Sequence, residues 1–375
     1  MPDRNTALIK EKLKLKLKTV LLITVIWILS GIFFYIIEAL NLNKELNRIN
    51  IHIDSSNILL LRMISVTAAG IITGIFEAFM SEKRYAKLHF GKLIIYSTFY
   101  YMSLYFLLFT ASIVLYQMFV FHNDMTIIGL PLLIINYFFT PNAFLGMIVF
   151  GIIVLFSTFM LRVREKFGPG TITNFLVGKY FTPKEEVRIF LFLDLKSSTS
   201  IAEKLGPLNY HRFLNDFYRE ITYPILYKKG EIYQYVGDEV SISWSEKNGL
   251  NNNNCIECFF EIENVIRHSI HNYLMKYDVF PEFKAGLHIG KTVAGEIGII
   301  KREIVYSGDT LNTTARIQEL CNVYGEQLIV SGDLMNRLSS KNNYLINELG
   351  EQYLRGRTAS ISLYSIRKQA AISAA

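Results

Sequence analysis

Two aspartates, Asp194 and Asp238, are the residues of this chain best placed to do chemistry. Asp194 ends an apolar run that starts at Arg188, and Asp238 lies in a Gly-Asp turn between two alternating segments, 231–236 and 239–244. These patterns predict a buried strand and a β-hairpin. If the strand and the hairpin are neighbours, the two carboxylates converge beside the start of the next helix. Oxygen ligands and free backbone N–H groups there could hold a pair of Mg²⁺ ions and the phosphates of a nucleoside triphosphate.

The elements that must position these aspartates follow one another in the second half of the chain. Apolar periodicity and turn residues predict them in this order: strand 187–194, helices within 198–228, hairpin 231–244, helix 256–277, strands 282–290, 292–298 and 303–306, helix 309–322, strand 327–330 and a terminal strand pair. Helices inserted among antiparallel strands indicate an α+β sandwich of the ferredoxin-like, split βαβ type. A segment of about 200 residues is long enough for one hydrophobic core.

The first half of the chain has the composition of a membrane domain. Hydrophobic residues make up 51% of the sequence, and they concentrate before residue 161. A helix needs about 20 apolar residues to cross the hydrocarbon core. Runs of that kind lie at 19–40, 58–80, 93–121 and 143–161. We therefore expect an all-α transmembrane domain of four helices over residues 19–161. A fifth stretch, 126–139, is short and contains Pro131, so we expect it to be re-entrant or interfacial.

Lysine and arginine placement predicts how this domain is oriented. Basic residues gather in the leader 1–18, between the second and third runs, and directly after the fourth run. The positive-inside rule then puts both termini in the cytoplasm of a multi-pass protein of the inner (plasma) membrane, in contact with lipid. These flanks account for much of the net charge of +7, so no nucleic-acid partner is expected. A linker, 162–186, leads to the second half, and a tail, 368–375, follows it.

Several other reactive side chains are expected to be structural. Glu38, Arg62 and Glu77 lie near the ends of their predicted spans, where a charged group can reach the interface. The cysteines fall in the cytoplasmic half, where disulfides are rare, and no second pair completes a metal site with Cys255 and Cys258. Four histidines of this half have no mutual metal-ligand spacing and are also expected to be structural: His211, His268, His271 and His288.

Three ordered motifs resemble the catalytic domain of class III nucleotidyl cyclases over about residues 187–367. The motifs are the run Arg188–Thr199, the turn Gly237–Asp238 and the segment Gly308–Arg316. The resemblance is to the membrane-anchored bacterial type. It implies that Asp194 and Asp238 bind two divalent ions, Mg or Mn, with the backbone carbonyl of Leu195 as a further ligand. We expect Ser198 and Thr199, at the helix start, to contact the phosphates of the substrate.

The resemblance also implies how the nucleotide is processed. Asn312 and Arg316 match the residues that position the ribose and stabilise the pentavalent phosphorus across a head-to-tail homodimer interface. The two residues are four apart, so they share one face of the predicted helix. A planar guanidinium suits the developing equatorial charge. Arg355 and Arg357 match a basic hairpin that binds the terminal phosphates.

Base selection is where the chain departs from the family pattern. Adenylate-specific members commonly carry Lys and Asp or Thr at two base-reading positions, and guanylate-specific members carry Glu and Cys. This chain has Gln234 and Val305 there. We expect an adenylate cyclase, a lyase of intracellular signalling that turns ATP into 3′,5′-cyclic AMP and pyrophosphate, because that activity prevails among bacterial members. GTP or a pyrimidine triphosphate remains an alternative substrate. The cytoplasmic half could instead be a nucleotide-binding regulatory domain on a membrane receptor or transporter.

Overall fold

The computed structural model describes most of the chain. The described residues are 4–49, 55–84, 89–120, 141–167, 174–175, 177–355, 357 and 359–369. The chain divides into two compact units, Ile9–Pro169 and Gly170–Ala375, the latter grouped with Met1–Leu8. Each unit has its own hydrophobic core, so each is considered by itself.

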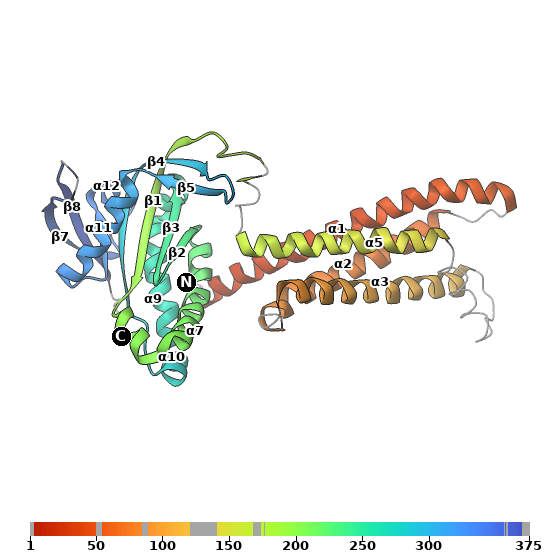
Figure 1. The fold of residues 1–375 in the computed structure, drawn as a ribbon, viewed down its shortest axis with the longest axis horizontal. Helices are drawn as coiled ribbons and strands as arrows, with labels where there is room; N and C mark the ends of the chain where they lie inside the picture. The colour runs from red at the N-terminus through yellow and green to blue at the C-terminus, as the bar shows by residue number, and fades with distance from the viewer. Residues whose placement is uncertain are drawn as a thin grey trace. The chain divides into compact units, whose positions relative to one another are not determined.

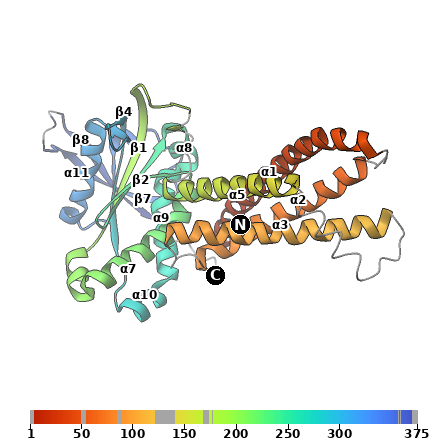
Figure 2. The same ribbon diagram turned by 45° about the vertical axis from the view of Figure 1, so that its right-hand side comes forward.

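The first unit is helical. Its long helices among the described residues are α1 (Arg4–Ile49), α2 (Ser55–Arg84), α3 (Phe90–Val120) and α5 (Pro141–Phe167). Each of the four apolar runs expected from the sequence falls on one helix, although α1 extends well beyond its run at both ends. The two views show these helices alongside one another (Figures 1 and 2). Their shared core draws on all four helices: Ile23, Trp27, Val66, Ala69, Tyr101, Phe150 and Val154. The stretch 126–139 lies outside the described residues.

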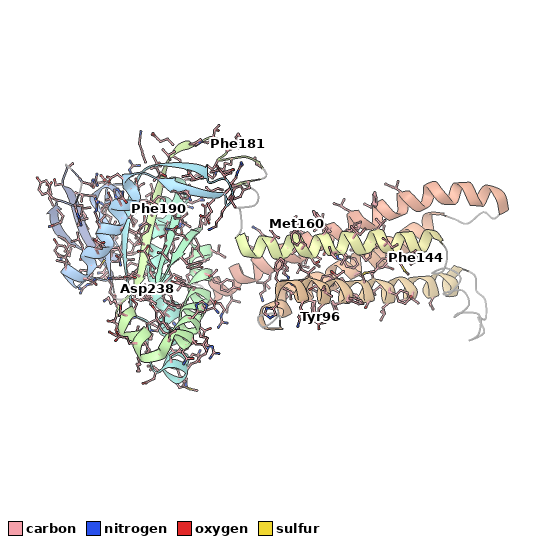
Figure 3. All side chains as sticks on the ribbon, in the orientation of Figure 1. Tyr96, Phe144, Met160, Phe181, Phe190 and Asp238 are labelled. Carbon is pink, nitrogen blue, oxygen red and sulfur yellow. The ribbon has the colours of Figure 1, made fainter. Side chains whose placement is uncertain are left out.

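The outer surface of this unit is apolar. Tyr96, Phe144 and Met160, labelled in Figure 3, are 58%, 63% and 40% exposed. Within the described residues, Lys16–Phe33 is the stretch long and apolar enough to cross a membrane, and Met63–Phe79 and Met147–Val163 are shorter apolar stretches. The four helices are confirmed as helices, whereas their crossing of a membrane stays a prediction.

Glu77 does not reach the surface of its unit, contrary to the sequence-based interpretation. Its side chain is buried, and both carboxylate oxygens accept from Nη2 of Arg162, at 2.6 and 2.7 Å. The hydroxyl of Tyr101 donates to the same carboxylate. These contacts join α2, α3 and α5. Arg162 lies 85 residues from Glu77 in the sequence, so local sequence spacing could not predict that the two side chains pair. The side chains of Glu38 and Arg62 lie outside those the structure describes.

The second unit is built on one mixed sheet. Its elements are β1 (Lys184–Leu195), α7 (Ser198–Tyr227), β2 (Glu231–Val236), β3 (Glu239–Ser245), α8 (Glu246–Leu250), α9 (Asn254–His268), α10 (Ile270–Tyr277), β4 (Phe283–Ile297), β5 (Glu303–Ser307), α11 (Asp309–Tyr324), β6 (Leu328–Ser331), α12 (Gly332–Met335), β7 (Tyr344–Gln352) and β8 (Ile361–Lys368). The strand order is β2-β3-β1-β4-β6-β8-β7, and β5 pairs with β4. Paired strands are antiparallel except β4 and β6.

The first part of this sheet confirms the predicted split βαβ fold. The sequence β1-α7-β2-β3-α9-β4 gives the spatial order β2-β3-β1-β4. The expected strands 282–290 and 292–298 are a single strand, because β4 stays paired with β1 as far as Ala294 and then with β5. The expected helix 256–277 divides at Ser269, and the short helices α8 and α12 were not predicted.

Helices cover both faces of the sheet (Figures 1 and 2). Alternate residues of β1, including Leu191 and Leu193, join the core formed with α7 and α9. Phe190, midway along β1 in Figure 3, faces the other way and packs near α11. On β4, a Cβ added to Gly286 would lie 2.4 Å from the backbone nitrogen of Gln318. This glycine therefore lets α11 approach the sheet closely, on the face toward which the even-numbered residues of β1 point.

Candidate active site

The structure brings the two predicted aspartates together. Asp194 pairs with Glu239 in the β1–β3 ladder, and Asp238 directly precedes Glu239 in the β2–β3 turn. The Asp238 carboxyl is close enough to that of Asp194 to act on its ionisation. Burial raises the pKa of Asp194, and the neighbouring Asp238 raises it further, while Lys284 acts in the opposite direction. Figure 3 labels Asp238 towards the end of the sheet at which β1 finishes.

One oxygen of Asp194 already has partners. Oδ2 accepts from Nε2 of Gln318 at 3.0 Å and lies 3.3 Å from Nζ of Lys284. Lys284 also donates to Oδ1 of Asn322 at 2.9 Å, and its side chain is buried on β4. Gln318 on α11 and Lys284 on β4 therefore fix the orientation of the Asp194 carboxylate through contacts within the protein.

The donor set fits a divalent cation. Two partly buried carboxylates that face each other repel as anions, and a bound cation would remove that repulsion. Leu195 follows Asp194 directly at the end of β1, where a main-chain oxygen can add a hard ligand. Among the described residues, no cluster of three or more His, Cys, Asp or Glu side chains could hold a metal ion. The carboxylate pair is therefore the feature on which a metal site would rest.

A tyrosine that the sequence did not single out holds the hairpin turn. Tyr218 on α7 donates through its hydroxyl to the carbonyl oxygen of Gly237 at 2.8 Å, and its ring lies 4.4 Å from that of Tyr235. Gly237 has a φ of 63°, which favours glycine at this turn. Burial raises the pKa of Tyr218, so the hydroxyl stays a donor. The turn that carries Asp238 is thus fixed by a helix remote from it in sequence.

The start of α7 offers backbone donors beside Asp194. Ser197 has a φ of 55° and its side chain does not cap the helix, and no acidic residue lies in the first turn. Ser198 is half-buried and Thr199 is exposed. Unpaired N–H groups at a helix N-terminus attract phosphate oxygens. The arrangement is therefore compatible with the expected phosphate contacts of Ser198 and Thr199.

The structure does not bring Arg316 to the Asp194 of its own chain. Asn312 is exposed and Arg316 is half-buried on α11, whereas Gln318 is 5% exposed and contacts Asp194. Two residues along a helix correspond to a rotation of about 200°. The face with Asn312 and Arg316 therefore points away from the face that holds Asp194. Within the described part of the chain, Arg316 forms no ion pair.

The expected phosphate and base contacts come from several elements. Arg357 lies at the start of α11, with Nε 3.3 Å from Oδ2 of Asp309, and Arg355 is exposed nearby in sequence. Gln234 is exposed on β2, and Val305 is half-buried on β5 opposite Gly295. The two strands approach each other, because the hydroxyl of Tyr233 accepts from the backbone N–H of Tyr306 at 3.3 Å. The two expected base-reading positions are therefore each adjacent in sequence to one of two contacting tyrosines, Tyr233 and Tyr306.

His288 gives the unit a sensitivity to acid. Its ring is buried on β4 and Nδ1 lies 2.8 Å from Oγ of Ser331. Burial lowers the pKa of His288 to about 4 from an ordinary value of 6.5. The unfolded chain takes up a proton first, so this group's stabilisation is complete above pH 6.5 and is lost as pH falls towards 4.

Replacing His288 should therefore flatten the acid side of the stability profile. The free energy of unfolding should fall between pH 7 and pH 4 in both proteins. We expect this decrease to be about 3 kcal/mol smaller in full-length His288→Asn protein than in the parent. Denaturant unfolding would be followed by fluorescence of the buried Trp244 in a Trp27→Phe background, since the chain has two tryptophans. Equal slopes for the two proteins across this pH range would contradict the assignment.

Comparison with known proteins agrees with this geometry. Residues 180–368 match the family model described as the adenylate and guanylate cyclase catalytic domain. The chain is 38% identical over 208 residues to adenylate cyclase 2 of Rhizobium meliloti (strain 1021), covering 56% of this chain and 57% of that protein. It is 23% identical over 209 residues to an adenylate cyclase of Anabaena cylindrica, covering 53% of this chain and 40% of that protein. The chain thus spans less than two thirds of either relative.

A solved structure shares the fold. The structure of a bacterial light-regulated adenylyl cyclase superposes with a TM-score of 0.50 at 21% identity, over 57% of this chain and 64% of that chain. The resemblance inferred from three motifs is therefore confirmed by an independent match that spans half of the sequence. Through its residues 180–368, the chain belongs to the adenylate and guanylate cyclase catalytic domain family.

Proposed function

We propose that this protein is a membrane-anchored adenylate cyclase that converts ATP into 3′,5′-cyclic AMP and pyrophosphate. The observation that carries the proposal is the meeting of Asp194 and Asp238 at the ends of β1 and the β2–β3 hairpin. Membership of the cyclase family and the names of the two bacterial relatives support the choice of reaction. In this reaction the ribose 3′-oxygen attacks the α-phosphorus, the 3′-hydroxyl loses its proton and pyrophosphate leaves.

The chain's own residues would divide the work as follows. Asp194, Asp238 and the Leu195 carbonyl would hold two ions, Mg²⁺ or Mn²⁺. Such ions, when bound, lower the pKa of a coordinated hydroxyl and neutralise charge on the leaving group. Asn312 would orient the ribose, and the guanidinium of Arg316 would stabilise the extra equatorial charge on phosphorus, an interaction whose loss costs about 2.7 to 4 kcal/mol of barrier.

Two parts of the second unit would bind the phosphates of the substrate. The N-terminus of α7, with Ser198 and Thr199, offers backbone donors to phosphate oxygens. Arg355 and Arg357 would bind the terminal phosphates through their guanidinium forks. Arg357 would then exchange its contact with Asp309 for one with phosphate. No side chain needs to act as a covalent nucleophile.

The proposal includes a homodimer. Arg316 faces away from its own Asp194, so a second copy of the chain must supply it to the metal pair. The β4–β5 hairpin also presents exposed apolar side chains: Ile299 is 92% exposed and Ile300 is fully exposed. Apolar residues gathered at one tip favour a covered surface. Two equivalent sites per dimer follow from this arrangement.

The helical unit would anchor the enzyme. Its outward-facing apolar side chains and the basic residues that flank its helices support a multi-pass location in the inner membrane. Both termini would then be cytoplasmic. In this proposal, residues 19–161 form the membrane domain, 162–186 the linker and 187–367 the catalytic domain.

A second candidate substrate has a specific observation in its favour. Val305 offers no hydrogen bond to a base, and the exposed amide of Gln234 can both donate and accept. An amide of that kind suits either purine edge, and the matched family covers guanylate as well as adenylate cyclases. GTP is therefore the alternative that an assay must include.

One assay separates these candidates. Full-length protein in detergent or vesicles would receive ATP, GTP, CTP and UTP separately with Mn²⁺, and products would be identified by mass. We expect cyclic AMP as the main product and none from Asp194→Asn, which keeps the side-chain shape and removes the charge. Predominant cyclic GMP would favour the second candidate. No cyclic product from any triphosphate would reject both.

A further inference from the structure

Helix α11 carries two sets of polar residues on opposite faces. Asn312 and Arg316 lie on the outward face, whereas Gln318 and Asn322 reach Asp194 and Lys284 of the same chain. In the proposed dimer, the outward face serves the partner's site and the inward face touches the chain's own metal carboxylate. In the proposed function, the outward-facing Asn312 and Arg316 act on the substrate. Gln318, on the inward face, has no role in that function.

Gln318 is buried, and both its side chain and its backbone are held by close contacts. Its side chain is 5% exposed, and Nε2 donates to Oδ2 of Asp194 at 3.0 Å. The backbone of Gln318 packs so closely on Gly286 of β4 that a Cβ there would lie 2.4 Å from its nitrogen. The amide therefore approaches Asp194 from a fixed position. It adds no charge beside the carboxylate, unlike the ammonium of Lys284 at 3.3 Å from the same oxygen.

We propose that Gln318 is a positioning residue of the metal site, an inference that rests on the proposed function. Its amide holds Oδ2 of Asp194 and thereby sets the orientation of this carboxylate beside Asp238. Without the amide, Lys284 is the remaining partner of Oδ2 among the described contacts. The carboxylate can then turn to pair more fully with the ammonium, which competes with a metal cation. Gln318 thus favours the metal-binding orientation over the internal ion pair.

Direct metal binding tests this role without reference to turnover. Mn²⁺ would be titrated into nucleotide-free full-length protein and followed by electron paramagnetic resonance of the free ion. We expect Gln318→Met, which has similar length and no amide, to bind Mn²⁺ about 10-fold or more weakly, as is usual when a hydrogen-bond partner of a metal ligand is removed. The matched control is Glu319→Met, an exposed neighbour on the same helix, which should bind like the parent. Parent-like affinity in Gln318→Met would overturn the proposal.

A second experiment separates this role from general damage to α11. In dimers that combine an Asp194→Ala chain with an Arg316→Ala chain, one site keeps both its aspartates and its arginine. Gln318→Met would be placed on either chain in turn. We expect about 10-fold more Mn²⁺ to be needed for half-maximal activity when the change is on the chain that supplies Asp194. No change is expected when it is on the chain that supplies Arg316.

The outcomes of these experiments test the positioning role of Gln318 separately from the shared dimer site of the proposed function. A defect that follows the chain supplying Arg316 would mean that Gln318 only shapes α11, and the positioning role would be wrong. If the combined chains make no cyclic nucleotide, the shared site of the proposed function fails. The Mn²⁺ titration still decides the role of Gln318 in that case, because it needs neither a dimer nor a substrate.

Discussion

A chain carrying Asp194→Ala and a chain carrying Arg316→Ala should each be inactive alone and should regain activity when they are combined in one membrane. The first change removes a carboxylate of the proposed metal site. The second removes a guanidinium whose loss typically costs about 10²- to 10³-fold in rate. Because α11 turns Arg316 away from the Asp194 of its own chain, each intact site in the proposed dimer draws on two chains.

The expected size of the recovery follows from random pairing. Equal expression of the two chains gives mixed dimers in about half of all pairs, each with one complete site, so activity should return to about a quarter of the parent. Cyclic nucleotide formation would be measured in membranes at equal total protein. Co-purification through two different affinity tags would verify that mixed dimers form.

A matched pair of chains makes this experiment decisive. Asp194→Ala combined with Asp238→Ala should give no recovery, because both aspartates of any one site come from the same chain. Recovery in this control equal to that of the first pair would contradict the arrangement. So would a lack of recovery in the first pair when tagged mixed dimers are present.

Much of the catalytic unit could be predicted because local patterns and topology agree there. The run ending at Asp194 and the alternation around Gly237-Asp238 each specify a strand by their own period, and β1 pairs with β3 as the convergence of the aspartates requires. The spacing of Asn312 and Arg316 likewise specified a shared helix face, which α11 provides. These features depend on residues close together in sequence.

The contacts that fix the site could not be predicted from such local sequence patterns. Gln318 lies 124 residues from Asp194, and Tyr218 lies 19 residues from Gly237 on a different element. A buried amide or phenol reads as an ordinary helix residue until the tertiary structure shows what it faces. The continuous β4 has a similar cause, because its pairing with β1 and β5 overrides the local signal at 290–291.

The helical unit illustrates the same limit with a charged group. The position of Glu77 near the end of an apolar run suggested exposure at the interface. Its pairing with Arg162 depends on how α2 and α5 pack. A buried carboxylate and guanidinium satisfy each other, and Tyr101 completes the set. The contribution of this cluster to the stability of the helical unit can therefore be tested by substitution.

Removing only Arg162 should destabilise the helical unit strongly. Arg162→Met leaves the carboxylate of Glu77 buried without its cation, a change that costs about 3 to 5 kcal/mol in buried pairs. The double variant Glu77→Gln with Arg162→Met should recover most of this loss, because the amide is neutral and still accepts from Tyr101. Unfolding in detergent would be followed by the fluorescence of the buried Trp27 in a Trp244→Phe background. Lys18→Met, which removes an exposed cation from α1, is the charge-matched control. A single variant as stable as this control, or a double variant no more stable than the single one, would show that the ion pair does not hold α2 against α5.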